Sequence, residues 1–227
     1  MRAKSAGLRV KSAGRHPAPR ARLSFAERRA QIIAQACDFF AEYGLTGQTR
    51  QLAAACGVSQ RLLYSVFPGK AALLDEVYRE AILHPFRAVW LEQLADRSRG
   101  IEERLNTFYR EYAAVVLTRR WMRLFLYASL AESDMAPDYI TRIIMRLLET
   151  IVAETAAALD VPLPQQKPVL HEIGWGLHGP VSHLAIRKHV YGASRSVPEA
   201  EIIALYVRNY LAGFPATVAA CCAPVPA

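Results

Sequence analysis

The 227-residue sequence lacks the features that mark disulfide-rich or membrane-spanning proteins. It has only four cysteines, and none of them shows C-x-x-C spacing, so we expect reduced thiols. No apolar run approaches the ~18–20 residues that span a bilayer, and no apolar signal-peptide core follows the basic N-terminus. We therefore expect a cytoplasmic protein with no membrane partner.

The sequence also lacks the motifs of common enzymes. It contains no Gly-rich phosphate loop, no nucleophile elbow and no metal motif. His171, His178 and His183 lie within one predicted helix, but no carboxylate or cysteine completes a recognisable ligand spacing. We predict no catalytic residue, no metal and no cofactor; an enzymatic C-terminal domain is the alternative.

Acidic residues are absent from residues 1–22, which carry seven basic residues, while the whole chain has a net charge of +8. This segment contains two near-copies, MRAKSAG and LRVKSAG. Because it has too little apolar surface to offset its chain entropy, we expect a disordered basic arm. Such an arm can follow DNA phosphates or enter a minor groove; an inert N-terminus or a transit peptide is the alternative.

Alternation typical of strands is missing as well, whereas helical periodicity recurs along the chain. The sequence therefore predicts an all-α fold. The expected helices cover residues 27–43, 49–55, 60–66, 74–84, 101–117, 120–130, 137–159, 169–190 and 198–213. Pro180 is expected to kink or interrupt the helix that contains it.

The two short helices at residues 49–55 and 60–66 have the pattern of a helix-turn-helix. Gly44 ends the preceding helix, and Gly57 can adopt the positive φ that the turn needs. Ser59 can cap the second short helix. This arrangement is typical of proteins that place a helix in the major groove of DNA.

The second short helix has a polar face and an apolar face. Gln60 and Tyr64 share the polar face with Arg61, whereas Leu63 and Phe67 lie opposite. Gln can bond the edge of adenine and Arg the edge of guanine, each pair providing ~1–3 kcal/mol of discrimination. The polar face is a candidate DNA reader; a solvated amphipathic turn is the alternative.

Residues 28–74 resemble the N-terminal domain of TetR-family regulators. The motifs that carry the resemblance are Phe40-x-x-x-Gly44, Leu52-Ala53-x-x-x-Gly57-Val58-Ser59 and Leu63-Tyr64-x-x-Phe67-x-x-Lys70-x-x-Leu73. Gln48 and Val66 depart from the family pattern, which often has Ser or Thr and His at these positions. The residues that the resemblance places against DNA are Thr49, Arg50, Gln60, Arg61, Tyr64 and Lys70.

Among these residues, Arg50, Gln60 and Arg61 would read bases, and Tyr64 and Lys70 would hold phosphates. Lys70 opens a predicted helix, where its ammonium and the helix amides can bind one phosphate together; a solvated lysine is the alternative. The resemblance implies a repressor released from a pseudo-palindromic operator in double-stranded DNA by a small apolar or aromatic effector. The alternatives are a DNA-binding or adaptor protein without sequence readout, or a helical-domain enzyme.

The expected domains are a basic arm (1–22), a three-helix DNA-binding domain (23–70), a helical bundle for effector binding and dimerisation (71–217), reached by a linker helix, and a flexible tail (218–227). Aromatic residues on the bundle helices are candidates for the effector pocket, although aromatic residues on helices more often belong to a plain core. The candidates are Phe86, Trp90, Phe108, Tyr112, Trp121, Phe125, Tyr139, Trp175 and His178.

The last two predicted helices are candidates for a homodimer interface. Gly174, Gly176 and Gly179 on one of them would allow another helix to approach closely. The apolar residues of the last helix suit a four-helix interface. They are Ile202, Ile203, Leu205, Tyr206, Tyr210 and Leu211.

Overall fold

The computed structural model describes residues 23–131, 134–194 and 196–222. All regular structure in these residues is helical, which confirms the all-α fold class. The helices are α1 (Phe25–Tyr43), α2 (Thr49–Ala55), α3 (Gln60–Val66), α4 (Lys70–Tyr78), α5 (Val89–Ala95), α6 (Ile101–Val115), α7 (Arg119–Leu130), α8 (Met135–Tyr139), α9 (Met145–Leu159), α10 (Lys167–His189) and α11 (Glu199–Cys222), with π-helical turns η1 (Arg79–Leu83) and η2 (Ile140–Ile144).

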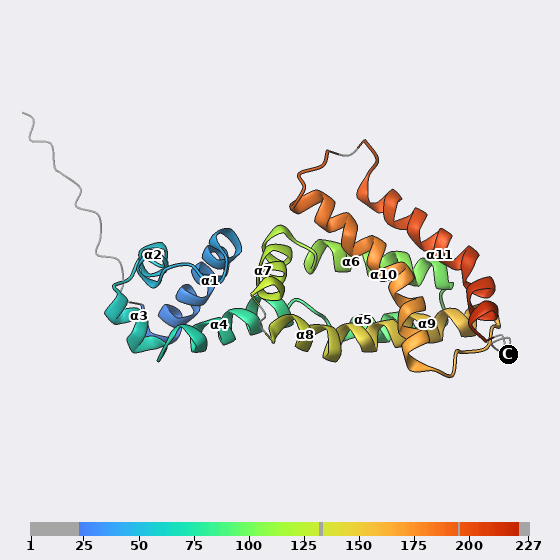
Figure 1. The fold of residues 1–227 in the computed structure, drawn as a ribbon, viewed down its shortest axis with the longest axis horizontal. Helices are drawn as coiled ribbons and strands as arrows, with labels where there is room; N and C mark the ends of the chain where they lie inside the picture. Colours follow the sequence, from blue (N-terminus) through green and yellow to red (C-terminus); the bar gives the residue numbers. More distant parts are fainter. Residues whose placement is uncertain (1–22, 132–133, 195, 223–227) are drawn as a thin grey trace, which may run out of the picture.

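The molecule is elongated, with α1, α2 and α3 at one end and α9, α10 and α11 at the other (Figure 1). In the larger part, α10 packs against α9 and α11, and α11 also packs against α6. The predicted basic arm and the last residues of the predicted tail, 223–227, lie outside the described residues.

Helix α1 begins two residues before the predicted start because Ser24 and Glu27 form a reciprocal cap. The Ser24 Oγ accepts from the Glu27 amide at 3.2 Å, and the Ser24 amide donates to Glu27 Oε2 at 2.8 Å. Gly44 ends the helix with φ of +77°, and its amide donates to the Phe40 carbonyl at 3.0 Å.

Helices α2 and α3 have the bounds that the sequence predicts. Gly57 has φ of +65° in the turn between them, and Ser59 Oγ accepts from the Leu62 amide at 3.1 Å. Leu52 of α2 and Leu63 of α3 are buried against α1 in the common core. The expected turn glycine and helix cap are therefore confirmed.

The linker helix is α4 continued by η1, and it ends beside His84, as the sequence predicts. Two hydrogen bonds attach it to the larger domain. Tyr78 Oη donates to Asp138 Oδ2 at 2.8 Å, and the Trp121 Nε1 donates to the Ile82 carbonyl at 3.3 Å. The second bond uses a carbonyl in a π-helical turn, where the usual helical pairing is displaced.

The two domains also meet where α7 lies against α1. Arg119 pairs with Glu42 at 3.0 Å and Arg120 pairs with Asp38 at 3.2 Å. Arg123 donates to the Glu42 carbonyl at 3.0 Å and also to the carbonyl of Ala41. Cationic donors at the C-terminal end of α1 satisfy free carbonyls and complement the helix dipole.

The sequence-based prediction missed α5. Its two buried residues, Trp90 and Leu94, are one helical turn apart, and a seven-residue helix shows too little of the 3.6-residue period to stand out. Trp90 is held in place because its Nε1 donates to Glu111 of α6 at 2.8 Å. The short helix covers one side of α6.

Helix α11 continues beyond the predicted end at Gly213 and includes the first five residues of the predicted tail. Val218 is completely buried, and Phe214 is buried one turn before it, so packing extends the helix through Pro215. Residues Glu199–Cys221 are also long and apolar enough to cross a membrane by composition, contrary to the sequence-based expectation. Only 22% of that apolar window is buried.

The sequence predicts that Pro180 kinks or interrupts its helix; of these two effects the interruption does not occur, because α10 is continuous through Pro180. Gly174 allows the close approach that the sequence predicts, and the neighbour is α9 of the same chain. A Cβ at Gly174 would lie 2.7 Å from Leu148 Cβ and 3.3 Å from Leu148 Cα.

We expect Gly174→Ala to lower the free energy of unfolding by about 1–3 kcal/mol, because the new methyl group overlaps α9. The matched control is Gly176→Ala, where no atom outside the helix's own nearby backbone lies within 4 Å of the new Cβ. The control should leave stability unchanged or raise it by up to about 1 kcal/mol through helix propensity. Urea unfolding measures both variants; equal effects would contradict the close approach.

Candidate nucleic-acid interface and inner cavity

Helix α3 presents its polar residues to solvent, and the apolar residues on its other side belong to the buried hydrophobic core. Gln60 and Arg61 are exposed and Tyr64 is 47% exposed, whereas Leu63 and Phe67 are buried. This two-sided burial agrees with the division predicted from the sequence. The exposed side of α3 is available for contact with a groove of DNA.

Helix α2 adds a second set of polar groups to this surface. Arg50 is exposed and Thr49 is partly exposed in its first turn. The side chain of Gln48, at the N-cap of α2, accepts no hydrogen bond from the first amides of that helix. Within the described residues, neither Arg50 nor Arg61 has a carboxylate partner, so both guanidinium groups remain available to an acceptor on DNA.

Lys70 has a structural contact that the sequence did not reveal. Its Nζ donates to the Gly47 carbonyl at 2.9 Å and lies 5.8 Å from the centre of the Phe40 ring. The ammonium therefore ties the start of α4 to the loop between α1 and α2. A lysine ammonium has three hydrogens, so two remain for a phosphate.

The position of α3 is reinforced by Arg29 of α1, which the sequence-based reasoning missed. Its guanidinium pairs with Glu76 of α4 at 3.0 Å and lies 5.4 Å from the centre of the Phe67 ring. Arg29 thereby joins α1, the end of α3 and α4. No local sequence motif marks this role, because the three residues come from different elements.

Residues 32–77 match the family model described as bacterial regulatory proteins, tetR family. This part of the chain is thus similar to the N-terminal domain of that family. The match covers most of the three helices just described, together with α4. A comparison with curated proteins gave no match.

Solved structures extend the likeness to the larger domain. A TetR-like transcriptional regulator from Rhodococcus sp. RHA1 has a TM-score of 0.64 and 20% identity, over 85% of this chain and 100% of that one. A tetR-family transcriptional regulator from Streptomyces coelicolor has a TM-score of 0.59 and 20% identity, over 87% of this chain and 85% of that one. At these identities, the likeness establishes the fold.

The larger domain contains an inner cavity of about 120 Å³ between α6, α7, α8–η2 and α10. Six of the nine predicted pocket residues line it, and no Asp, Glu, Lys or Arg does. The six are Tyr112, Trp121, Phe125, Tyr139, Trp175 and His178. The remaining wall residues, which the sequence-based list omitted, are Leu117, Met122, Leu126, Ile140, Ile144, Ser182 and Ile186.

The other three predicted pocket residues, Phe86, Trp90 and Phe108, do not line this cavity. They pack behind Tyr112, with the Trp90 ring centre 5.9 Å from those of Phe108 and Tyr112. The Phe86 ring centre lies 5.5 Å from that of Trp90. Helical spacing alone does not distinguish aromatic residues that line the cavity from those that support its wall.

Three tyrosines and one histidine bring polar atoms to the cavity and its wall. The hydroxyls of Tyr112 and Tyr139 are 3.1 Å apart, and the Tyr109 hydroxyl is 3.4 Å from Nδ1 of His178. Burial raises the pKa of each tyrosine and lowers the pKa of His178 to about 4. The cavity is therefore uncharged at neutral pH.

No group of three or more His, Cys, Asp or Glu side chains in the described part of the chain is arranged to hold a metal ion. The structure thus brings together two features of different kinds. One is a polar surface on α2 and α3, and the other is an uncharged aromatic cavity in the larger domain.

The buried His178 should make the folded protein less stable in acid. Its pKa of about 4 lies below the ordinary histidine pKa of 6.5, so the unfolded chain binds a proton first as pH falls through this interval. Stability contributed by neutral His178 is present above pH 6.5 and is lost towards pH 4. Between pH 7 and 4.5 this loss is on the order of 2–3 kcal/mol.

His178→Phe should remove that part of the pH dependence, because the new side chain does not titrate. Urea unfolding of the natural and variant proteins at pH 7 and pH 4.5 measures the free energy of unfolding and hence its pH dependence. An identical fall in the free energy of unfolding for the two proteins would contradict the assignment of a neutral buried histidine.

Proposed function

We propose that this protein is a sequence-specific transcriptional repressor of the TetR family, released from a pseudo-palindromic DNA operator by a small apolar or aromatic effector. The observation that carries the proposal is the exposed face of α3. Among the described residues, neither Gln60 nor Arg61 has a carboxylate partner on it, and Leu63 is buried on its other side. Side chains of these two types suit the edges of adenine and guanine in the major groove.

Phosphate contacts would position this helix. Tyr64 presents a half-exposed hydroxyl one turn after Gln60, and Lys70 lies at the start of the next helix, already oriented by the Gly47 carbonyl. Contacts of this kind set orientation and supply affinity that does not depend on sequence. In the proposed complex, Arg50 adds a third base reader from α2.

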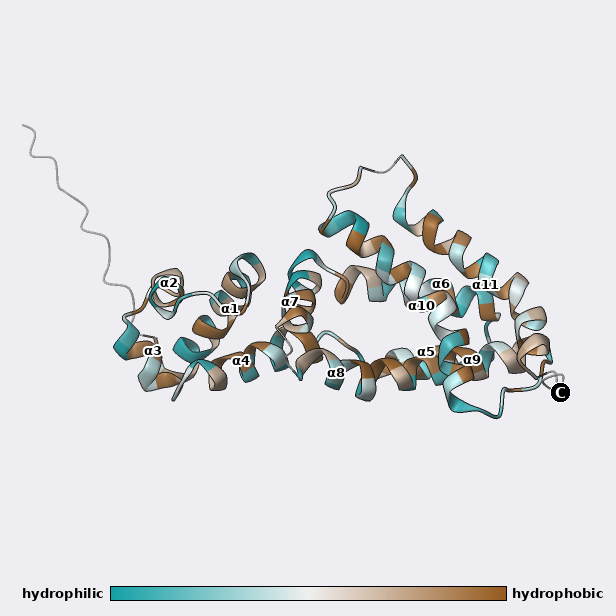
Figure 2. Ribbon diagram, viewed as in Figure 1, coloured by the Kyte–Doolittle hydropathy of each residue, from teal (hydrophilic) through white to brown (hydrophobic). Residues whose placement is uncertain are grey.

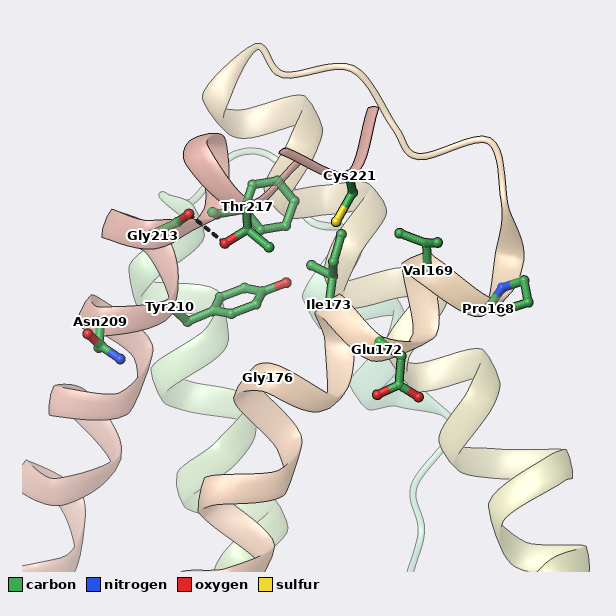
Figure 3. Close-up of a pocket in the computed structure, with 11 residues that line it drawn as sticks. Pro168, Val169, Glu172, Ile173, Gly176, Asn209, Tyr210, Gly213, Thr217 and Cys221 are labelled. Carbon is green, nitrogen blue, oxygen red and sulfur yellow. Dashed lines mark hydrogen bonds between the residues drawn. The ribbon is translucent and has the colours of Figure 1, made fainter. Parts of the chain in front are cut away.

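A second copy of the chain would cover α10 and α11. These helices pack against each other, and a groove of about 630 Å³ lies between the first part of α10 and the last part of α11; Figure 3 shows Tyr210 and Thr217 of α11 on one side of it and Val169 and Ile173 of α10 on the other. Figure 2 shows apolar residues along α11, and Leu205 is 53% exposed. A two-fold dimer through these helices would present two copies of α3 to successive turns of DNA.

Helix α7 is the proposed connection between effector and DNA. Arg119, Arg120 and Arg123 hold α1 from one side of α7, while Trp121 and Phe125 line the inner cavity from another. A molecule that enlarges the cavity would displace α7 and with it the contacts to α1. Release then requires that the effector binds the displaced arrangement more tightly than the other.

The readout model predicts two classes of variant. Arg50→Ala and Gln60→Ala should each weaken preferred DNA relative to random DNA by ~1–3 kcal/mol, because a base contact is lost. Tyr64→Phe and Lys70→Ala should weaken both DNAs alike, because phosphates carry no sequence information. The preferred DNA is obtained by selecting bound duplexes from a random pool, and titrations at fixed salt measure the affinities.

A palindromic motif in the selected DNA supports the proposal. Recovery of no motif, or equal losses on preferred and random DNA for Arg50→Ala and Gln60→Ala, would instead favour binding without sequence readout.

The connection through α7 predicts that DNA binding changes the structure or dynamics of the helices around the cavity, since coupling between two sites is reciprocal. Addition of the selected DNA should change amide hydrogen exchange in α7 and η2. Arg123→Ala should reduce that change, because the variant loses the donors to the last turn of α1. Arg110→Ala, an exposed α6 arginine without an ion-pair partner among the described residues, is the control. An unchanged response in Arg123→Ala would contradict the connection.

A further inference from the structure

We propose that the inner cavity selects an uncharged ligand that carries a hydrogen-bond acceptor, such as a small aromatic carbonyl compound, and that Nε2–H of His178 is the donor that recognises it. The inference rests on the proposed function to the extent that the cavity is taken as the effector site. It adds the chemical class of the ligand and names the residue that determines specificity.

The assignment of His178 as a donor follows from counting hydrogens. Tyr109 is completely buried, and its hydroxyl has one close partner among the described residues, Nδ1 of His178 at 3.4 Å. If the tyrosine donates, its hydrogen is satisfied and Nδ1 accepts. If Nδ1 donates instead, the tyrosine hydrogen remains buried without an acceptor, which is costly. The first arrangement is favoured, and a neutral imidazole that accepts at Nδ1 carries its hydrogen at Nε2.

Nε2 of His178 is the polar atom of this ring that remains for a ligand. His178 lines the cavity, whereas Tyr109, which engages Nδ1, does not. No residue in the described part of the chain is hydrogen-bonded to Nε2. The low pKa of this histidine keeps the ring neutral, so the site offers a hydrogen-bond donor without a positive charge.

The tyrosine pair provides a second donor. The Tyr112 and Tyr139 hydroxyls are 3.1 Å apart, and together they have two hydrogens. One hydrogen lies between the two oxygens, and the other is left for a ligand. The cavity thus contains at least two donors that have no acceptor among the described residues, from His178 and from the tyrosine pair, and its lining holds no ionised acceptor.

The walls restrict the ligand to a flat, uncharged group. Trp121 and Phe125 are stacked with ring centres 4.7 Å apart and an interplanar angle of 12°, and Tyr139 meets Trp121 edge-on at 5.2 Å. No charged side chain is present to compensate a buried carboxylate or ammonium. A cavity of about 120 Å³ suits a single ring with a short substituent; an apolar cavity of ~150 Å³ holds benzene in another protein.

Three probes of similar size separate these properties. Acetophenone has a ring and a carbonyl acceptor, ethylbenzene has the same shape without the acceptor, and benzoate has acceptors with a negative charge. Calorimetric titration of the full-length protein should give the tightest binding for acetophenone, about 3- to 10-fold weaker binding for ethylbenzene, and none for benzoate. Ethylbenzene binding as tight as acetophenone, benzoate binding, or no binding of any probe would overturn the proposal.

The residue assignment is tested with His178→Phe, which keeps a ring of similar size and removes the donor. The preference for acetophenone over ethylbenzene should fall to at most about twofold, whereas His183→Asn, at an exposed position of the same helix, should retain it. An unchanged preference in His178→Phe would overturn the role of His178.

A measurement on the natural protein covers the case in which His178→Phe does not fold. Nitrogen-15 NMR of the labelled histidines should show hydrogen at Nε2 of His178, and hydrogen at Nδ1 would overturn the assignment. DNA selection is independent of all three probes. A protein that selects a palindrome but shows no acceptor preference would retain the proposed function and refute only the ligand class.

Discussion

The packing of α7 against α1 is the contact on which the arrangement of the two domains depends. Arg123 donates to carbonyls at the end of α1, while Arg119 and Arg120 pair with carboxylates along its side. Exposed ion pairs of this kind contribute little individually. The donors to backbone carbonyls matter more because they satisfy groups that the end of a helix leaves free. Since α7 also lines the inner cavity, one helix contacts both α1 and the cavity.

The linker helix provides a second, parallel connection. Tyr78 bonds Asp138 near the start of the α8–η2–α9 helix, and Ile82 accepts from the indole of Trp121. The Ile82 bond involves the π-helical turn η1, and the turn η2 contributes Ile140 and Ile144 to the cavity wall. Backbone of this type is common near functional sites because its hydrogen bonds are less regular than those of an α-helix. The DNA-binding helices and the cavity are therefore joined through two elements rather than one.

Much of the DNA-binding domain could be predicted because its elements depend on local chemistry. Gly57 supplies a positive φ, Ser59 caps α3, and Leu63 and Phe67 share one helix face, all within a few residues of one another. The residues that line the cavity were harder to predict from the sequence. Trp90 and Phe108 are aromatic residues on helices, as Trp121 is. They nevertheless pack behind the cavity wall, whereas Trp121 lines the cavity. The direction in which an aromatic side chain points depends on which helix crosses it.

The sequence by itself determined the all-α class, the bounds of α2 and α3, and the two-sided character of α3, since capping, glycine conformation and helical periodicity act over a few residues. Only the tertiary structure decided that Gly174 meets α9, that Arg29 joins three helices, and that Lys70 bonds Gly47. It also decided that α11 runs to Cys222, because Val218 becomes buried once α11 packs against its neighbours. These contacts join residues far apart in the chain, and their free energy exists only after the helices have packed.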